Sequence, residues 1–358
     1  MVQLWGSDLV HAIPSASAVF PVCVGKQRGA DKMKHIPFLL RPVGKDYLWG
    51  GERLKTAYHK QIDLTPLAET WECSTHPDGC SIVDSGAAAG KPLRAVLQEH
   101  PEYLGIYANP EGELPILIKL IDAKKDLSVQ VHPDDAYAKQ YENGQNGKTE
   151  MWYVLEAEPD ASLVYGFRHT MTPERLRQSL AEGTLEADLQ SVPVSKNDAF
   201  LIPAGTVHAI GAGILLAEIQ QSSNLTYRLY DYNRTDAQGN KRPLHIEKAV
   251  ATVDYQQKPL PEQNRIVEQK DGYTEELLCA CPYFQVSRLH LQAATPAVAA
   301  AVSTTNAFAV LLCISGSGTM TAETGETLAF QKGQCVFVPA DTTVRELSGT
   351  ADLLWITA

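Results

Sequence analysis

Four side chains in three short apolar segments could together bind a divalent metal ion. In the segment DLSVQVHPDD, Gln130 and His132 stand two residues apart in a strand-like run, so their side chains point to the same face. Glu150 opens a second strand-like run, EMWYVLE, and His208 ends a third, NDAFLIPAGTVH. One amide, two imidazoles and one carboxylate form a donor set that suits zinc or another divalent first-row ion with open coordination positions. Open positions are what a catalytic metal requires.

Each of these residues also has an ordinary structural interpretation. A single His or Glu in a strand usually lies at the surface or is satisfied by a local hydrogen bond. Here, however, the segments QVHP, KTEMWYVL and PAGTVHAI each hold one or two potential ligands within an otherwise apolar strand. Burying several polar groups without partners is energetically unfavourable. Their common setting therefore favours one shared site.

The elements that carry these residues are predicted to be mainly short strands. From Lys34 to about Leu127, apolar runs such as IPFLL and PILIKLI alternate with turn-rich stretches such as LWGG and HPDGCS. A helix is predicted after Thr172, where an N-cap residue and a proline precede ERLRQSLAEG, and Gly183 ends it. We interpret residues around 172–190 as a small helical insertion between strands.

Two further segments suggest boundaries. A second helical stretch, HIEKAVATV from His245 to Val253, precedes a polar, Pro-containing segment at 256–269 that we predict to be a domain linker. Residues 1–32 precede a second methionine, Met33, and are interpreted either as a largely disordered extension or as the result of a misassigned start. They form a poor secretion signal, because no Lys or Arg precedes the apolar stretch and prolines interrupt it.

An internal repeat indicates a duplicated β unit. NDAFLIPAGTVH, which starts at Asn197, resembles GQCVFVPADTTV, which starts at Gly333, at a constant offset of 136 residues. Two similar β units in one chain favour a duplicated sandwich or barrel over a solenoid, which needs shorter and more numerous repeats. The second copy has Val344 in place of His208, and no carboxylate where Glu150 would fall, near Ala309. Any chemistry is therefore predicted in the first copy.

Composition excludes several classes of function. The 358 residues suffice for two domains, and the net charge of −11 offers no basic face to nucleic acid or to anionic lipid. No run of about eighteen apolar residues occurs, so a membrane-spanning helix is not expected. Seven cysteines, an odd number in a chain too large to need disulfides, favour reduced thiols and a cytoplasmic location.

Four segments resemble the type I mannose-6-phosphate isomerase family, in order and in spacing. They are SVQVHPDD, GKTEMWYVL, PAGTVHAIGAGILLAEIQQSSNLTYRLYDYNR and RPLHIEKA. The resemblance covers most of Met33 to about Val253 and continues more weakly beyond. It implies a mainly β fold of two cupin-like jelly-roll β-barrel units, a catalytic domain at 33–255 and a degenerate cupin-like domain at 270–358. Seventeen residues separate His132 from Glu150, more than in a generic cupin, and this long surface insertion is itself a feature of the family.

The resemblance also implies one zinc ion per chain, bound by the four residues named above, and a catalytic arginine at Arg228 in SSNLTYRLYD. The implied reaction interconverts mannose 6-phosphate and fructose 6-phosphate through an enediol. Positive charge from zinc and Arg228 would stabilise the developing oxygen charge. Lys148 is the favoured candidate base and Glu218 a second candidate, which could instead orient a metal ligand. Ser128 and Lys119 are candidates for contacts with the substrate phosphate.

Two other functions stay open at this point. A cupin oxygenase would use iron in a related barrel, and metal content and oxygen dependence would distinguish it. A sugar-binding cupin would have lost its catalytic residues, whereas the four ligands and Arg228 are all present here. The sequence does not settle whether the protein is a monomer or a dimer.

Overall fold

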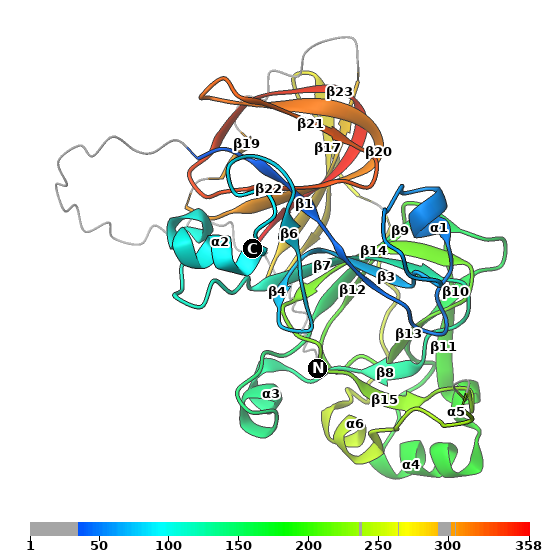
Figure 1. Ribbon diagram of the computed structural model, residues 1–358. Coiled ribbons are helices and arrows are strands. Elements are labelled where there is room, and N and C mark those ends of the chain that lie inside the picture. The colour runs from blue at the N-terminus through cyan, green and yellow to red at the C-terminus, as the bar shows by residue number, and fades with distance from the viewer. Residues whose placement is uncertain (1–34, 236–237, 264, 293–301, 305) are drawn as a thin grey trace, which may run out of the picture. The chain divides into compact units, whose positions relative to one another are not determined.

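A computed structural model describes residues 35–235, 238–263, 265–292, 302–304 and 306–358. The predicted extension at 1–32 lies outside these residues. The described chain is mainly β, and residues from Lys34 onward cluster into one compact unit (Figure 1). Its central layer is an antiparallel six-stranded sheet in the order β12 (Ala199–Ile202), β9 (Glu150–Ala157), β14 (Ile214–Gln221), β7 (Ile116–Ala123), β3 (Glu69–Cys73) and β2 (Val43–Lys45).

A five-stranded antiparallel sheet packs against one face of this central sheet. Its order is β11 (Leu189–Pro193), β10 (Ser162–Phe167), β13 (His208–Ile210), β8 (Val129–Val131) and β15 (Tyr227–Tyr230). Alternate side chains of both sheets share one apolar core, which includes Trp152 and Val154 from β9 and Leu163 and Tyr165 from β10. The candidate site residues lie on these facing surfaces.

The other face of the central sheet packs against a ten-stranded sheet formed largely by the C-terminal part of the chain. Every residue of β7 and β14 is buried, as expected for strands covered on both faces. The shared core of this second interface includes Leu215 and Ile219 from β14 and Phe337 and Ile356 from the C-terminal part.

The ten-stranded sheet also includes two strands from the N-terminal part of the chain. Its main path is β16 (Val267–Gln269), β17 (Tyr273–Ala280), β18 (Gln285–Leu291), β23 (Thr343–Thr357), β20 (Ala309–Ala322), β22 (Cys335–Val338), β1 (Phe38–Arg41) and β6 (Ile82–Val83). β19 (Val302–Ser303) pairs with β23, and β21 (Thr327–Gln331) pairs with β20. The division into domains at 33–255 and 270–358 stays a prediction. Strand β1 of the first predicted domain pairs with β22 of the second, so both contribute strands to one sheet.

Strand register confirms the internal repeat. In the first copy, Ile202 of β12 pairs with Glu150 of β9. In the second copy, Val338 of β22 pairs with Ala309 of β20. Ile202 and Val338 are equivalent positions of the repeat, so Ala309 does stand where Glu150 stands in the first copy. Val344, the counterpart of His208, is fully buried among apolar side chains.

The predicted helix after Thr172 is confirmed as α4 (Pro173–Glu182). The Thr172 side chain accepts a hydrogen bond from the Arg175 N–H, and Gly183 ends the helix in the left-handed conformation. Short helices α5 (Leu185–Asp188) and α6 (Ile246–Thr252) follow, the latter within the predicted second helical stretch. The remaining short elements are α1 (Arg53–Thr56), α2 (Leu93–Glu99), a 3₁₀ turn η1 (Pro101–Leu104), α3 (Asp135–Tyr141) and the hairpin of β4 (Thr75–His76) and β5 (Gly79–Cys80).

Two observations concern the predictions on membrane-spanning helices and on disulfides. Among the described residues, no helix is long and apolar enough to cross a membrane. The six described cysteines are free thiols. The seventh, Cys23, lies outside the described residues.

Candidate metal and substrate site

Two rows of side chains, one on each facing sheet, build the site. Across the central sheet, Trp71 of β3, Lys119 of β7, Glu218 of β14 and Trp152 of β9 stand directly opposite one another in successive strand pairs. Side chains directly opposite in neighbouring antiparallel strands lie close enough to interact. The register of the strands therefore brings together residues that are far apart in the sequence.

The second row crosses the five-stranded sheet. His208 of β13 pairs with Gln130 of β8, and Gln130 pairs in turn with Arg228 of β15. Glu150 stands two residues before Trp152 on β9, so it shares the inward face of the central sheet. His132 follows directly after β8. The four predicted metal ligands thus converge from both sheets.

Three of these ligands form a tight, fully buried group. One ligand atom each of His132, Glu150 and His208 lies within 4.8 Å of the others. His132 Nε2 is 3.1 Å from Glu150 Oε1, and His208 Nε2 is 3.6 Å from Glu150 Oε2. Glu150 Oε2 has no hydrogen-bond partner among the described residues, although the carboxylate is fully buried. A buried carboxylate oxygen without a partner is unfavourable, and a cation between these atoms would satisfy it.

Hydrogen bonds orient both imidazoles toward the centre of the group. His132 Nδ1 lies 2.7 Å from the Leu225 carbonyl oxygen, and His208 Nδ1 lies 2.8 Å from that of Thr206. Nδ1–H donation to a carbonyl leaves the Nε2 lone pair for a metal ion. Burial lowers the pKa of His208, and burial followed by the charge of Lys148 lowers that of His132 to about 3. Both rings are therefore held in the neutral form that ligation needs.

Gln130 joins the group less closely. Its amide nitrogen lies 3.4 Å from His208 Nε2, and its amide oxygen lies 3.4 Å from the Ser128 hydroxyl oxygen. The two ends of an amide are assigned from their surroundings. A rotation of the amide by 180° would present its oxygen to the centre as a fourth donor.

Lys148 contacts the ligand group directly. Its ammonium donates to Glu150 Oε1 and lies 3.3 Å from His132 Nε2. Burial alone would raise the pKa of Glu150, but the positive charge of Lys148 outweighs burial and holds the pKa well below its usual value. The carboxylate is therefore ionised and available as a metal ligand.

Lys119 and Glu218 form a second buried charged pair beside the ligand group. The Lys119 ammonium is 2.8 Å from Glu218 Oε1 and 4.0 Å from Glu69 Oε2. The Trp152 indole N–H donates to Glu218 at 3.0 Å, and that of Trp71 donates to Glu69 at 2.9 Å. Burial lowers the pKa of Lys119, but the two carboxylates outweigh it and raise the pKa above the usual value. Lys119 is therefore a cation held between two anions.

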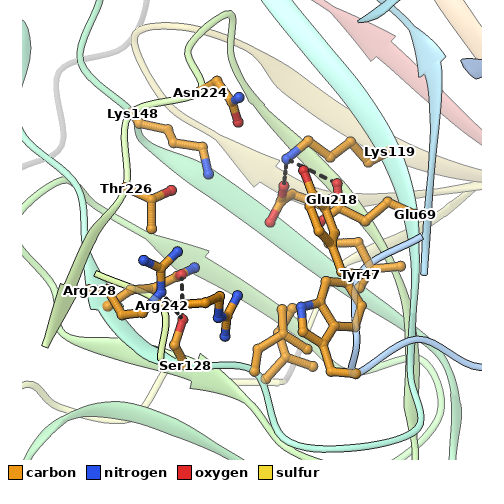
Figure 2. A pocket seen from close by; sticks show the side chains of 15 residues that line it. Tyr47, Glu69, Lys119, Ser128, Lys148, Glu218, Asn224, Thr226, Arg228 and Arg242 are labelled. Atoms are coloured by element: carbon orange, nitrogen blue, oxygen red, sulfur yellow. Dashed lines mark hydrogen bonds and ion pairs between the residues drawn. The ribbon is translucent and has the colours of Figure 1, made fainter. Parts of the chain in front are cut away.

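A pocket of about 270 Å³ opens over these groups (Figure 2). Figure 2 shows Arg228 and Arg242 beside Ser128, while Lys119 lies with Glu218 and Glu69. The lining residues are Tyr47, Trp49, Glu69, Lys119, Ile121, Leu127, Ser128, Gln130, Lys148, Ile210, Glu218, Asn224, Thr226, Arg228 and Arg242. Four cationic side chains against two carboxylates make this pocket suited to an anionic, polar ligand.

Two hydrogen bonds hold the guanidinium group of Arg228. Its Nε donates to the Ser128 hydroxyl at 3.3 Å, and its Nη1 donates to the Pro243 carbonyl oxygen at 2.8 Å. Arg242 is held by Asp231, whose Oδ2 accepts from the Arg242 Nε at 2.8 Å. Arg234 also pairs with Asp231. One carboxylate thus anchors two cations near the end of β15.

The structure brings all the predicted site residues into this region, and it adds others. Four residues of this region were not predicted from the sequence: Arg242, Glu69 and the two indole donors Trp71 and Trp152. Arg242 begins the segment RPLHIEKA, which contributed to the resemblance as a motif rather than through that residue. Glu69 and Trp71 lie on β3, whose register with β7 cannot be read from the sequence.

Comparisons with known proteins indicate one family. The family model for the type I phosphomannose isomerase catalytic domain matches residues 38–163, and the mannose-6-phosphate isomerase cupin domain model matches 274–357. Mannose-6-phosphate isomerase ManA of Bacillus subtilis is 36% identical over 89% of this chain and 98% of its own length. The Streptococcus mutans enzyme is 36% identical over 85% of this chain and 92% of its own length.

Solved structures give the same result. The crystal structure of mannose 6-phosphate isomerase from Bacillus subtilis superposes with a TM-score of 0.82 at 32% identity, covering 89% of this chain and 99% of that one. A phosphomannose isomerase from Salmonella typhimurium, with a TM-score of 0.72 at 20% identity over 90% of this chain and 99% of its own, shares the fold. The expected fold of cupin-type units is thereby supported, and the chain belongs to the type I mannose-6-phosphate isomerase family.

Proposed function

We propose that this protein is a zinc-dependent isomerase that interconverts mannose 6-phosphate and fructose 6-phosphate. The observation that carries the proposal is the buried group of two oriented imidazoles and one carboxylate with an unpartnered oxygen, placed at a cationic pocket. The names of the family's relatives supply the substrate. The absence of disulfides among the described cysteines supports the predicted cytoplasmic location.

Gln130, His132, Glu150 and His208 are the residues that would hold one zinc ion per chain. Two neutral imidazoles, one carboxylate and one amide oxygen suit zinc and leave room for the substrate. When bound, zinc would supply Lewis-acid stabilisation of negative charge on the sugar oxygens. The Nδ1 hydrogen bonds of His132 and His208 hold the two donor nitrogens in place.

The reaction needs a base to move a proton between C1 and C2 of the open-chain sugar. Removal of the proton from C2 of the aldose, with protonation of the oxygen on C1, gives an enediol; return of the proton to C1, with loss of the proton from the oxygen on C2, gives the ketose. Lys148 is the candidate that lines the pocket and contacts the ligand group. Glu218 is the second candidate, but both of its oxygens already accept hydrogen bonds, from Lys119 and Trp152. This arrangement favours Lys148 for proton transfer and Glu218 for holding Lys119.

The substrate phosphate would bind at the end of the pocket formed by Ser128, Arg228 and Arg242. Arginine presents several N–H donors in a plane and retains its charge, so two arginines suit a dianionic phosphate. Lys119, the other predicted phosphate contact, already pairs with Glu218 at 2.8 Å. Arg242 is the better candidate of the two, because it lies beside Ser128 and Arg228 whereas Lys119 lies with Glu218 and Glu69.

A coupled assay with purified, zinc-loaded protein tests the proposal. Fructose 6-phosphate should form from mannose 6-phosphate, and removal of the metal by a chelator should abolish turnover until zinc is returned. Zinc bound at one equivalent per chain without turnover of mannose 6-phosphate would refute the function while leaving the metal site intact. Oxygen consumption with bound iron would instead indicate an oxygenase.

The role of Arg228 has its own test. Arg228→Ala should retain the fold and the metal but lose most turnover, because the guanidinium faces the pocket and stabilises developing negative charge. Thermal unfolding and metal analysis would serve as controls. Wild-type turnover in this variant would exclude Arg228 from the catalytic machinery.

A further inference from the structure

Arg228 lies on an edge strand, and its backbone groups are not all satisfied by the sheet. Among the described strands, β15 pairs only with β8 and ends the five-stranded sheet. The register of this pair shifts between Arg228 and Tyr230, where two residues of β15 correspond to one step of β8. Irregularities of this kind re-aim a side chain and interrupt the hydrogen-bond ladder. The position of Arg228 therefore depends on contacts from outside the sheet.

His245 supplies those contacts. The Arg228 N–H donates to His245 Nδ1 at 3.2 Å, and the His245 N–H donates to the Arg228 carbonyl oxygen at 2.8 Å. His245 thus forms the two hydrogen bonds that a residue of a neighbouring strand would form with Arg228. The difference is that the imidazole Nδ1, and not a carbonyl oxygen, is the acceptor. Two residues earlier, the Pro243 carbonyl oxygen accepts from the Arg228 guanidinium. The segment from Pro243 to His245 consequently holds both the backbone and the side chain of Arg228.

We propose that His245 is a positioning residue for Arg228, and that only its neutral form with Nδ1 as hydrogen-bond acceptor holds Arg228 in the catalytic position. The proposal rests on the proposed isomerase function. A proton on Nδ1 would remove the acceptor and place a cation against the Arg228 N–H. The Arg228 backbone would then keep only one of its two hydrogen bonds to His245, next to the register shift in β15. Misplacement of a catalytic group by about 1 Å can lower turnover about 100-fold.

The charged and titratable groups around His245 come from three elements. Arg228 and Tyr227 belong to β15, Lys248 belongs to α6, and Glu142 follows α3. Glu142 accepts hydrogen bonds from both the Tyr227 hydroxyl and the Lys248 ammonium, each at 2.6 Å. Its negative charge is therefore largely offset by Lys248.

The balance of these groups keeps the imidazole neutral near pH 7. Burial lowers the pKa of His245, and the charges of Arg228 and Lys248 lower it further, while Glu142 opposes them. Because the pKa is below the usual value, the acceptor form predominates at neutral pH. It would be lost only as the pH falls through this lowered pKa. The pH profile of activity should therefore fall on its acidic side, and protonation of His245 should cause this fall, which we call the acid limb.

Three variants test the role. His245→Asn keeps an acceptor oxygen near the position of Nδ1 but does not titrate, whereas His245→Ala removes the acceptor. His169→Ala is the matched control, since it removes a partly exposed imidazole that contacts Asp188 at 3.5 Å and does not line the pocket. For each variant, kcat and KM would be measured from pH 5 to pH 9, together with thermal unfolding and metal content.

We expect His245→Ala to lower kcat about tenfold or more with normal metal content. His245→Asn should recover kcat to within about threefold of the wild type and lack the acid limb. The control should resemble the wild type. Wild-type kcat in His245→Ala, or an unchanged acid limb in an active His245→Asn, would overturn the proposal.

A measurement on the wild-type protein covers the case in which the variants do not fold or the isomerase assay fails. Amide hydrogen exchange at Arg228, corrected for the intrinsic effect of pH, should show protection that falls about tenfold as the solution is acidified through the titration of His245 observed by NMR. Constant protection across that titration would refute the positioning role. This readout needs no substrate, so it separates failure of the inference from failure of the proposed function.

Discussion

The buried Lys119–Glu218 pair gives a quantitative test of the site's electrostatics. Both side chains are only 5% exposed and lie 2.8 Å apart, and Glu218 also accepts from the Trp152 indole. Lys119→Met replaces the ammonium with an apolar group of similar length and leaves Glu218 as an uncompensated buried charge. Removing one partner of a buried ion pair typically costs about 3–5 kcal/mol of unfolding free energy. With an unfolding entropy of about 2.1 cal/mol/K per residue, a chain of this size should then lose roughly 4–7 °C in Tm.

Companion variants separate the charge effect from packing. Glu218→Gln alone should cost less than Lys119→Met, because Glu69 remains near Lys119 and the amide still accepts from Trp152. In the double variant, Glu218 no longer leaves a buried charge, and only Glu69, 4.0 Å from Lys119 in the wild type, loses its cation, so the double variant should recover at least half of the stability lost in Lys119→Met. Urea unfolding at pH 7.5, with circular dichroism to confirm the native fold, provides the unfolding free energies.

The loss in Lys119→Met should also depend on pH. Burial and the charge of Glu150 both raise the pKa of Glu218. Without Lys119, the folded protein binds this proton more tightly than the unfolded chain does. Stability relative to the wild type should therefore improve as the pH falls through the raised folded-state pKa, and worsen as the pH rises. A deficit that is independent of pH, with no recovery in the double variant, would show that packing rather than charge determines the cost.

Three further predictions concern single residues. His208→Val, which copies the second unit's Val344, should lower zinc content by at least about tenfold, as measured by atomic absorption after dialysis against a weak chelator. Arg242→Ala should raise KM about tenfold or more with a smaller effect on kcat, since its proposed contact is with the non-reacting phosphate; an unchanged KM would exclude that contact. Thr172→Ala should lower the unfolding free energy by about 1 kcal/mol without affecting kcat, because it removes only the N-cap of α4.

The sequence was sufficient to predict that His132, Glu150 and His208 lie together, because each of the predicted ligands carries its own local signal. Gln130 and His132 are two apart in an apolar run, and Glu150 and His208 lie at the ends of others. The N-cap and the terminal glycine of α4 are equally local signals. Features that are marked by neighbouring residues and by simple periodicity can be predicted without knowledge of the fold.

Contacts that depend on long-range register were not predictable. The positions of Glu69 and Trp71 follow from the pairing of β3 with β7, and nothing near either residue indicates that pairing. β1 pairs with β22, almost 300 residues away, so the sequence could not show that the two parts of the chain share a sheet. α3 lies within the segment interpreted as a long surface insertion, where a short helix has few apolar residues to give it a period.

Loss of the metal ligands from the second unit is consistent with a packing role for that unit. Ala309 and Val344 are fully buried there and contribute to an apolar core, whereas Glu150 and His208 at the equivalent positions belong to the buried polar group in which Glu150 Oε2 has no hydrogen-bond partner. The same unit covers the outer face of the central sheet, whose inner face carries the charged rows.

The second unit also contacts the segment before β9. Its Tyr283 hydroxyl donates a hydrogen bond to Asp135 at 2.9 Å. Asp135 also accepts a hydrogen bond at 2.8 Å from the backbone N–H of Gly147, the residue before Lys148. A unit without ligands of its own thus supports the segment that presents Lys148 and Glu150.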